Sequence, residues 1–282
     1  MTSSEVVSGD GRYGDHRHSR GLTCGVAFSV DEHVARVTIE RAERLNAVDA
    51  ATTARLNEVW AAIEGDPEVR VVVLTGAGER AFCVGADMSA DAVDKTGLEY
   101  WASLDPNGFG GLSLRDTLDV PVIARVNGYA LGGGMEMVLG CDIVVAAEHA
   151  QFGLTEPRVG RLPLDGGIAQ LVRRLPYTQA MGLLLTGRRA PAAELHRMGL
   201  VNEVVPAGEL DAAVDRWVAD VLACAPPSLR AIKQVVQRTT GMTAREAQSM
   251  RLPAVMAALD SEDAEEGVRA FQQKRPPAWT GR

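Results

Sequence analysis

Residues 121–142 read PVIARVNGYALGGGMEMVLGCD. An apolar run ends at Asn127-Gly128, glycines occupy positions 132–134, and the residues from Met135 to Leu139 could start a helix. Glycines between a strand and a helix let backbone N–H groups come close to a ligand. The stretch therefore predicts a turn that binds something small and rich in oxygen.

Glu136 follows these glycines, so a carboxylate lies beside the predicted oxyanion-binding turn. An acidic residue in a first helical turn also complements the helix dipole, and this stretch alone favours neither role. The loop has neither the Gly-Lys-Ser/Thr ending of a P-loop nor the G-x-G-x-x-G spacing of a dinucleotide site. We therefore do not expect either nucleotide motif to hold the ligand.

The composition narrows the class of protein. The length of 282 residues suits one large domain, or one domain with an appendage. The formal net charge of -8 argues against nucleic acid as a partner. No stretch reaches the ~18 apolar residues of a membrane span. The cysteines form no C-x-x-C pair and the histidines show no ligand spacing. We therefore expect a cytoplasmic protein with reduced thiols, no membrane partner and no metal.

The segments before the glycine turn read as a polar tail followed by strands and a helix. Residues 1–21 are expected to be a disordered tail. A hairpin is predicted from Val26, a helix over Ala50–Glu64 and a strand buried on both faces over Val69–Leu74. Residues 89–119 look irregular, as in a lid or pocket wall.

After the glycine turn, a buried strand is predicted over Cys141–Ala147, followed by a loop over residues 150–167 that contains Glu156. Shorter elements follow: helices over Ile168–Leu175, Tyr177–Leu185 and Pro191–Met198, and a strand over 199–206. Only helices are expected beyond Glu209, over Glu209–Ala225, Pro227–Arg238, Thr243–Leu259 and Glu262–Lys274. We place a boundary near Pro206, between an α/β core of residues 22–206 and a helical region of residues 207–282.

Four motifs, in order and spacing, resemble the enoyl-CoA hydratase/isomerase (crotonase) superfamily. They are AFCVGADM at 81–88, NGYALGGGMEM at 127–137, AQFGLTE at 150–156 and FQQKRPPAWTGR at 271–282. The resemblance runs from about Val26 to the C-terminus. It implies an α/β fold, the crotonase spiral of strand–strand–helix turns, with a C-terminal helical region that often packs across a trimer. A homotrimer or a dimer of trimers is therefore expected.

The resemblance also implies an acyl-CoA thioester as the substrate. The N–H groups of Ala86 and Gly133 match the pair that grips the thioester oxygen, and Glu136 and Glu156 match the glutamates that flank the double bond. The implied contacts to CoA are main chain near Arg44, Leu45, Val84 and Met88 for the adenosine, and Phe271 and Lys274 from the C-terminus, the lysine at the phosphates.

The residues themselves leave several alternatives open. Glu156 alone reads as a solvated loop acid. Lys274 reads equally as an exposed C-terminal lysine, and Phe271 as a residue that packs the last helix.

The implied reaction is hydration of a 2-enoyl-CoA to a 3-hydroxyacyl-CoA. Negative charge builds on the carbonyl oxygen as an enolate, and two N–H donors stabilise it. Glu136 is expected to orient and deprotonate the water, and Glu156 to protonate the α-carbon. No cofactor is expected, because coenzyme A is part of the substrate.

One loop departs from the family pattern. Residues 163–167 read Pro-Leu-Asp-Gly-Gly, where many members have Pro-Gly-x-Gly-Gly. Leu164 narrows or reshapes the loop. Asp165 is a third acid, which either caps the helix over residues 167–175 or touches the acyl group. This loop, together with GFGGL at 108–112, resembles the branch of carnitinyl-CoA dehydratase-like enzymes.

Because both glutamates are kept, hydration is favoured over the other reactions of the superfamily. The alternatives are an enoyl-CoA isomerase, a carnitinyl-CoA dehydratase-like lyase or an acyl-CoA hydrolase. An acyl-CoA-binding protein without turnover is the alternative outside the enzymes. Function has to be argued from the site rather than the fold.

Overall fold

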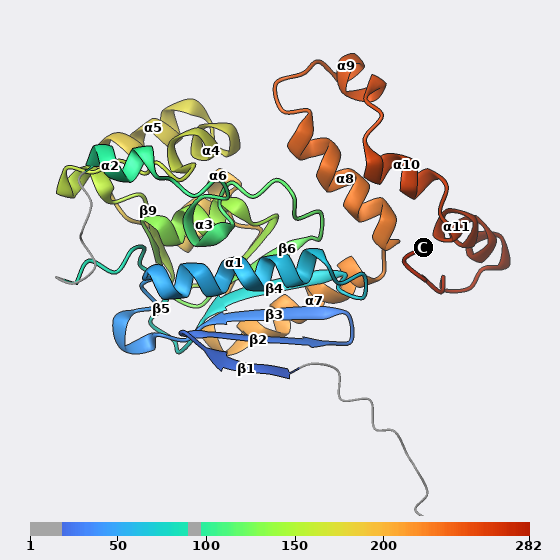
Figure 1. Ribbon diagram of the computed structural model, residues 1–282, viewed down its shortest axis with the longest axis horizontal. Helices are drawn as coiled ribbons and strands as arrows, with labels where there is room; N and C mark the ends of the chain where they lie inside the picture. The colour runs from blue at the N-terminus through green and yellow to red at the C-terminus, as the bar shows by residue number, and fades with distance from the viewer. Residues whose placement is uncertain (1–18, 90–96) are drawn as a thin grey trace, which may run out of the picture.

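The structure of the protein is a computed structural model that describes residues 19–89 and 97–282. Its strands form two sheets, with helices packed around them (Figure 1). In order across the larger sheet, the strands are β1 (Ser19–Thr23), β2 (Val26–Asp31), β3 (Val34–Ile39), β4 (Val71–Gly76), β6 (Val122–Val126), β8 (Ile143–Ala147) and β11 (Glu203–Val205). In order across the smaller sheet, they are β10 (Ala190–Pro191), β9 (Gln151–Gly153), β7 (Tyr129–Leu131) and β5 (Ala81–Cys83).

The chain winds through both sheets in repeated turns. Strands β4, β6 and β8 lie in the larger sheet, and each is followed along the chain by a strand of the smaller sheet, β5, β7 and β9. Helix α3 (Gly133–Gly140) then follows β7, and a helical turn and α4 (Gly167–Arg174) follow β9. Successive turns pair in parallel, with Val72 opposite Val122 and Ile123 opposite Ile143. The predicted α/β spiral of strand–strand–helix turns is therefore confirmed.

Apolar residues fill both faces of the larger sheet. On one face, the core joins the two sheets, α3 and helix α1 (Ala50–Glu64), which buries Leu56 and Trp60. On the other face, helix α7 (Leu210–Leu222) packs Val214 and its apolar neighbours against Val73 and Ile123. Strand β4 is thus buried on both faces, as its apolar run predicts. Because α7 covers the sheet, the core continues past the boundary expected at Pro206.

The helices after α7 extend away from the two sheets (Figure 1). They are α8 (Pro226–Arg238), α9 (Ala244–Ser249), α10 (Pro253–Leu259) and α11 (Glu262–Gln273). The single helix expected over Thr243–Leu259 is wrong, since the chain forms α9 and α10 instead. Pro253 has no N–H with which to continue a helix, and it stands in the first turn of α10, where that N–H is not needed. The two short helices predicted before residue 200 are present as α5 (Tyr177–Thr186) and α6 (Ala192–Met198).

Two other expectations need adjustment. Strand β1 pairs with β2, with Ser19 opposite Ser29, so the disordered tail expected over residues 1–21 is wrong for residues 19–21. Residues 1–18 lie outside the described residues, as do residues 90–96 of the expected lid or pocket wall. The rest of that wall contains helix α2 (Gly97–Ala102) and the turn η2 (Phe109–Gly111).

Within the described part of the chain, none of the helices combines the length and the apolar composition needed to span a membrane.

Candidate active site

Three parallel strands of the smaller sheet bring the candidate catalytic residues to one edge. Strand β7 pairs in parallel with β5 on one side, with Ala130 opposite Cys83, and with β9 on the other, with Leu131 opposite Gly153. Parallel strands end at the same edge of a sheet. The loops after β5, β7 and β9 carry Ala86, Gly133 and Glu156, so residues from three separate sequence motifs gather there.

Two backbone N–H groups form the candidate oxyanion site. A Cβ atom built on Gly85 would lie 3.1 Å from the nitrogen of Gly133, so the turn after β5 lies against the N-terminus of α3. Gly85 also has a φ of 94°, which a residue with a side chain rarely adopts. Within residues 19–89 and 97–282, the N–H groups of Ala86 and Gly133 donate no hydrogen bond to the protein. Both donors therefore remain available to a ligand oxygen.

Glu136 lies in the first turn of α3 and is 3% exposed. Its Oε1 accepts a hydrogen bond of 2.9 Å from the N–H of Gly167, the first residue of α4. Burial, and then the charge of Asp165, raise the pKa of Glu136 to about 8, although the bond from Gly167 works in the opposite direction. Glu136 is therefore a buried carboxyl group whose proton exchanges near neutral pH, a property typical of a catalytic acid or base.

Glu156 begins the helical turn η3 (Glu156–Val159) and is half-buried. A Cβ atom on Gly132 would lie 3.2 Å from its Oε1, which places the carboxyl group beside the N-terminus of α3. Its Oε2 is buried and has no hydrogen-bond partner among the described residues. Burial raises the pKa of Glu156, as does Asp165. The alternative of a solvated loop acid is therefore wrong for this residue.

Asp165 is a third acid of the site, and its predicted role as a helix cap is wrong. Helix α4 begins at Gly167 with Gly166 as its N-cap, and no side chain caps it. The Asp165 carboxylate, 4% exposed, instead accepts a hydrogen bond from the Tyr100 hydroxyl of α2. The hydroxyl of Ser113 holds the same loop by donating to the Asp165 carbonyl at 2.6 Å.

The electrostatic surroundings of the three carboxyl groups are acidic. Burial raises the pKa of Asp165, while the hydrogen bond from Tyr100 partly offsets it. The charges that act on Glu136, Glu156 and Asp165 come from one another and from Asp105. Burial and these same three carboxyl groups raise the pKa of Tyr100, so its phenol stays protonated. The site therefore suits proton exchange or a ligand with a positive group, rather than an anion placed beside the acids.

The segment expected to form a lid or pocket wall supplies two further residues that contact the site. Tyr100 bonds Asp165, and the ring of Phe109 would lie 2.5 Å from a Cβ atom on Gly133. The sequence signal for Tyr100 was its position in the irregular segment 89–119, and Phe109 lay within GFGGL at 108–112, with no role of its own assigned. Their partners are set by tertiary folding, since Tyr100 and Asp165 are 65 residues apart.

The residues expected to meet adenosine belong to loops beside the oxyanion turn, which is the turn after β5 that contains Gly85 and Ala86. The loop that contains Arg44 and Leu45 pairs with this turn through a parallel bridge between Val48 and Ala86. Leu45 has a left-handed backbone, with φ at 53°. Val84 and Met88 flank the turn, and Met88 is 63% exposed. Contact of these four residues with the adenosine of CoA therefore stays a prediction.

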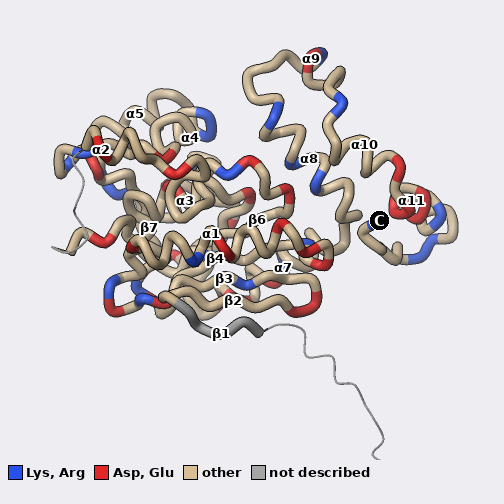
Figure 2. The backbone as a smooth tube through the Cα atoms, viewed as in Figure 1, with Lys and Arg blue, Asp and Glu red and all other residues tan. Residues whose placement is uncertain are grey.

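Phe271 and Lys274 are not brought to this edge within one chain. They stand at the end of α11, which lies at the far end of the molecule from α2 and β5 (Figure 1). Phe271 is 85% exposed, so it does not pack the last helix as one alternative proposed. Figure 2 shows acidic residues gathered at the start of α11, where the helix dipole favours them.

Among the described residues, no group of three or more His, Cys, Asp or Glu side chains has the geometry to hold a metal ion. The site is built from backbone N–H groups, carboxyl groups and a phenol. These groups can stabilise a developing oxyanion and move protons beside it.

Comparison with known proteins places these residues in context. The chain matches the family model for enoyl-CoA hydratase/isomerase over residues 29–282. The carnitinyl-CoA dehydratases of Shigella flexneri and Escherichia coli O157:H7 are each 39% identical to it over 253 residues, covering 88% of this chain and 95% of the relative. The enoyl-CoA hydratase structure from Mycobacterium tuberculosis H37Rv matches with a TM-score of 0.83 at 32% identity, covering 92% of this chain and 100% of that chain. An enoyl-CoA hydratase structure from Bacillus anthracis matches with a TM-score of 0.83 at 30% identity and the same coverage.

Proposed function

This chain belongs to the enoyl-CoA hydratase/isomerase (crotonase) family, a lyase-type family that acts on acyl-CoA thioesters, and we propose that it adds water reversibly across the C2–C3 double bond of a 2-enoyl-CoA. The product of hydration is a 3-hydroxyacyl-CoA. The observation that carries the proposal is the pair of carboxyl groups of buried Glu136 and half-buried Glu156, both with raised pKa values, beside two N–H donors that donate no hydrogen bond within the described residues.

The N–H groups of Ala86 and Gly133 hold the thioester oxygen. When water adds to C3, negative charge moves to this oxygen and an enolate forms. Donors already fixed in place stabilise that charge without reorganisation, and removing one typically slows such reactions by ~10² to 10³. Because Gly133 begins α3, the positive end of the helix dipole adds to the effect.

The two glutamates move the protons. In the hydration direction, ionised Glu136 removes a proton from the water as its oxygen bonds to C3, and protonated Glu156 delivers a proton to C2 as the enolate collapses. Because the pKa of Glu136 is raised to about 8, its ionised form, which acts as the base, becomes more populated as the pH rises toward 8. Burial raises the pKa of Glu156, which favours the protonated form that acts as the acid. In the reverse direction, Glu156 removes the C2 proton and Glu136 protonates the leaving hydroxyl.

A substrate panel tests this reaction. Enoyl-CoA thioesters of varied chain length, branching and polar substituents should lose their conjugated-thioester absorbance on mixing with the enzyme, and oxygen from labelled water should appear at C3. Shift of the double bond without label would indicate an isomerase, and release of free CoA would indicate a hydrolase. Binding of the whole panel without turnover would favour an acyl-CoA-binding protein.

A second candidate is dehydration of a 3-hydroxyacyl-CoA whose acyl group carries a cation. The carnitinyl group in the name of the 39% identical relatives is such a group, with a quaternary ammonium at its end. The observation in its favour is Asp165, a third buried carboxylate, bonded to the aromatic residue Tyr100. Carboxylates and aromatic rings are the groups that attract quaternary ammonium ions.

Substitution of Asp165 separates the two candidates. For a cationic substrate, Asp165→Asn should lower kcat/KM by about tenfold or more, equivalent to about 1.4 kcal/mol, because one attractive charge is lost. For a neutral crotonyl-type thioester, kcat/KM should stay the same or rise. Equal losses for both thioesters would count against the cationic substrate.

A further inference from the structure

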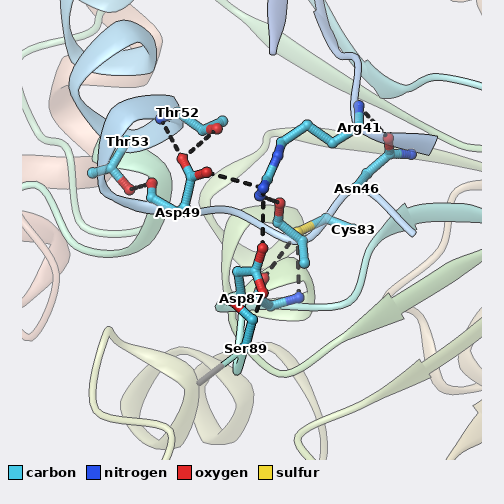
Figure 3. Close-up of polar contacts among 10 residues, drawn as sticks. Arg41, Asn46, Asp49, Thr52, Thr53, Cys83, Asp87 and Ser89 are labelled. Carbon is cyan, nitrogen blue, oxygen red and sulfur yellow. Dashed lines mark hydrogen bonds and ion pairs between the residues drawn. The ribbon is translucent and has the colours of Figure 1, made fainter. Parts of the chain in front are cut away.

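A side-chain network outside the reacting groups holds the oxyanion turn (Figure 3). Arg41 follows strand β3, and its guanidinium lies between two carboxylates. It donates to Asp87 Oδ2 at 3.0 Å and lies 2.9 Å from Asp49 Oδ2. The same guanidinium also bonds the carbonyl of Ala47. One cation thus joins three points of the chain.

Each carboxylate ties the guanidinium to a different element. Asp49 is the N-cap of α1 and accepts 2.8 Å hydrogen bonds from both the N–H and the hydroxyl of Thr52. Asp87 directly follows Ala86 and accepts a 3.1 Å hydrogen bond from the Ser89 N–H. Arg41 therefore links the start of a long core helix to the residue beside an oxyanion donor.

The loop that presents Arg41 is itself anchored in the core. Asn46 is fully buried and accepts a hydrogen bond from the backbone N–H of Arg41. Its amide donates to the carbonyl of Ala81 at 2.7 Å and to that of Ala77 at 3.0 Å. Because Ala81 begins β5, the loop is fixed to the strand that leads into the oxyanion turn.

Backbone hydrogen bonds complete the support and orient Ala86. The Val48 N–H donates to the Gly85 carbonyl at 2.9 Å, and the Asp87 N–H donates to the Val48 carbonyl at 3.0 Å. In such a parallel bridge, the residue between the two bonded peptides directs its own N–H away from the partner strand. The N–H of Ala86 therefore faces away from Val48.

We propose that Arg41 and Asp87, with Asp49 as the second anchor, are positioning residues that hold the N–H of Ala86 at the thioester oxygen. The inference rests on the proposed function only in assigning that oxygen to Ala86. An arginine fork suits this task, because its planar donors fix both the distance and the angle of the carboxylates. Catalysis by a backbone donor requires such fixed placement, and a displacement of about 1 Å can cost ~10²-fold in rate.

Arg41, Asp87 and Asp49 together form a clamp on the oxyanion turn, and the charges that this clamp needs are present at neutral pH. The hydrogen bond from Ser89 lowers the pKa of Asp87, and Arg41 adds to that effect. Burial works to raise the pKa of Asp49, but the bonds from Thr52 and the charge of Arg41 outweigh it. Both carboxyl groups are therefore ionised and paired with Arg41.

The test measures polarisation of the carbonyl in full-length protein. An excess of an acyl-CoA without a double bond, isotope-labelled at its thioester carbonyl, is bound to wild type, to Asp87→Asn and to Arg41→Lys. The infrared stretch of that carbonyl is then recorded for each protein. Wild type should shift the stretch to lower frequency, and both variants should return it toward the value of the free thioester. With an enoyl-CoA that the wild type hydrates, kcat should fall about 10- to 100-fold, with the dissociation constant nearly unchanged.

Glu64→Gln is the matched control, because it breaks another partly buried ion pair of α1, at 2.7 Å from Arg115, far along the helix from Asp49. It should lower the thermal midpoint without moving the carbonyl stretch. A full carbonyl shift in folded Asp87→Asn and Arg41→Lys would overturn the clamp. A wild-type shift without water addition to any enoyl-CoA would overturn the hydratase reaction but not the clamp, and no wild-type shift would overturn both.

Discussion

Glu136 is buried, and Glu156 is half-buried rather than fully solvated as a loop acid would be. A carboxyl group withdrawn from water keeps its proton to higher pH, and a neighbouring carboxylate extends that effect. The strand ends of the smaller sheet impose both conditions on these residues at once. Their chemistry therefore comes from the residue type combined with its place at that edge.

Removal of either carboxyl group should abolish most of the water addition. We expect Glu136→Gln and Glu156→Gln each to lower kcat by ~10² to 10⁴, the usual contribution of a general acid or base. The amide fills the same space but moves no proton, so binding of the acyl-CoA should persist. Steady-state turnover and calorimetric binding check the two halves of this statement. Normal turnover by both variants would contradict the assigned roles.

Folding stability should depend on pH through Glu136. Its pKa rises from an ordinary value of 4.5 when unfolded to about 8 when folded, so the folded protein binds a proton that the unfolded chain has released. Stability is therefore highest below pH 4.5 for this group, and its contribution is lost as the pH rises toward 8. The loss is on the order of a few kcal/mol.

The neutral variant Glu136→Gln provides the measurement. Its urea-unfolding free energy should exceed that of wild type more at pH 8 than at pH 5. An equal difference at the two pH values would show that Glu136 titrates alike in the folded and unfolded chains.

At the scale of elements, the start of α3 packs closely against Phe109 of the turn η2 and against the end of β5. A Cβ atom on Gly133 would come within 2.5 Å of the Phe109 ring, and one on Gly134 within 2.0 Å of the Cys83 carbonyl. Glycine is needed here for close approach rather than for turn geometry. The same close approach brings the α3 N-terminus to the end of β5 and so forms the oxyanion site.

Substitution of this helical glycine should disturb both packing and turnover. We expect Gly133→Ala to lower the free energy of unfolding by about 1–3 kcal/mol, because Phe109 or the backbone must shift. Turnover should fall as well, since the displaced N–H is an oxyanion donor. Gly182→Ala in α5 is the matched control, because a Cβ atom there has no neighbour within 4 Å. That change should stabilise the protein by up to about 1 kcal/mol, as alanine favours a helix. Equal unfolding midpoints for the two variants would argue against the close contact.

At the scale of the whole molecule, the C-terminal helices carry apolar side chains that one chain leaves uncovered. They are Ile232, Val236, Met256, Leu259, Val268 and Phe271. Exposed apolar surface of this kind, on helices that extend from the core, suits contact between subunits (Figure 1). It accords with the homotrimer or dimer of trimers that the family resemblance implies, which stays a prediction.

An acidic substitution on this surface should test the assembly. Val268→Glu places a charge on α11, so we expect a smaller particle by light scattering in solution. If Lys274 meets CoA only within the assembly, the same variant should also bind acyl-CoA more weakly. Glu262→Gln, at the start of the same helix, should change neither property. A monomeric wild type would refute the expected assembly.

The sequence by itself determined the repeated strand–strand–helix order, the glycine turns and the family, and it indicated Ala86, Gly133, Glu136 and Glu156. The glycine turns depend on turn chemistry, which neighbouring residues encode, whereas the strand–strand–helix order and the four site residues came from the resemblance that the four motifs carry. It also placed the helical region correctly in outline, though not the break at Pro253 or the packing of α7 on the sheet.

Only the tertiary structure decided which distant side chains meet. Tyr100 bonds Asp165, and Arg41 bonds Asp87, because long-range packing brings together segments 65 and 46 residues apart, which no local pattern records. Within one chain, α11, which contains Phe271, lies far from the site because the helices after α7 extend away from the two sheets (Figure 1). The glycine turn of residues 132–134 is thus readable from sequence, whereas the acids and the clamp around it follow from long-range packing.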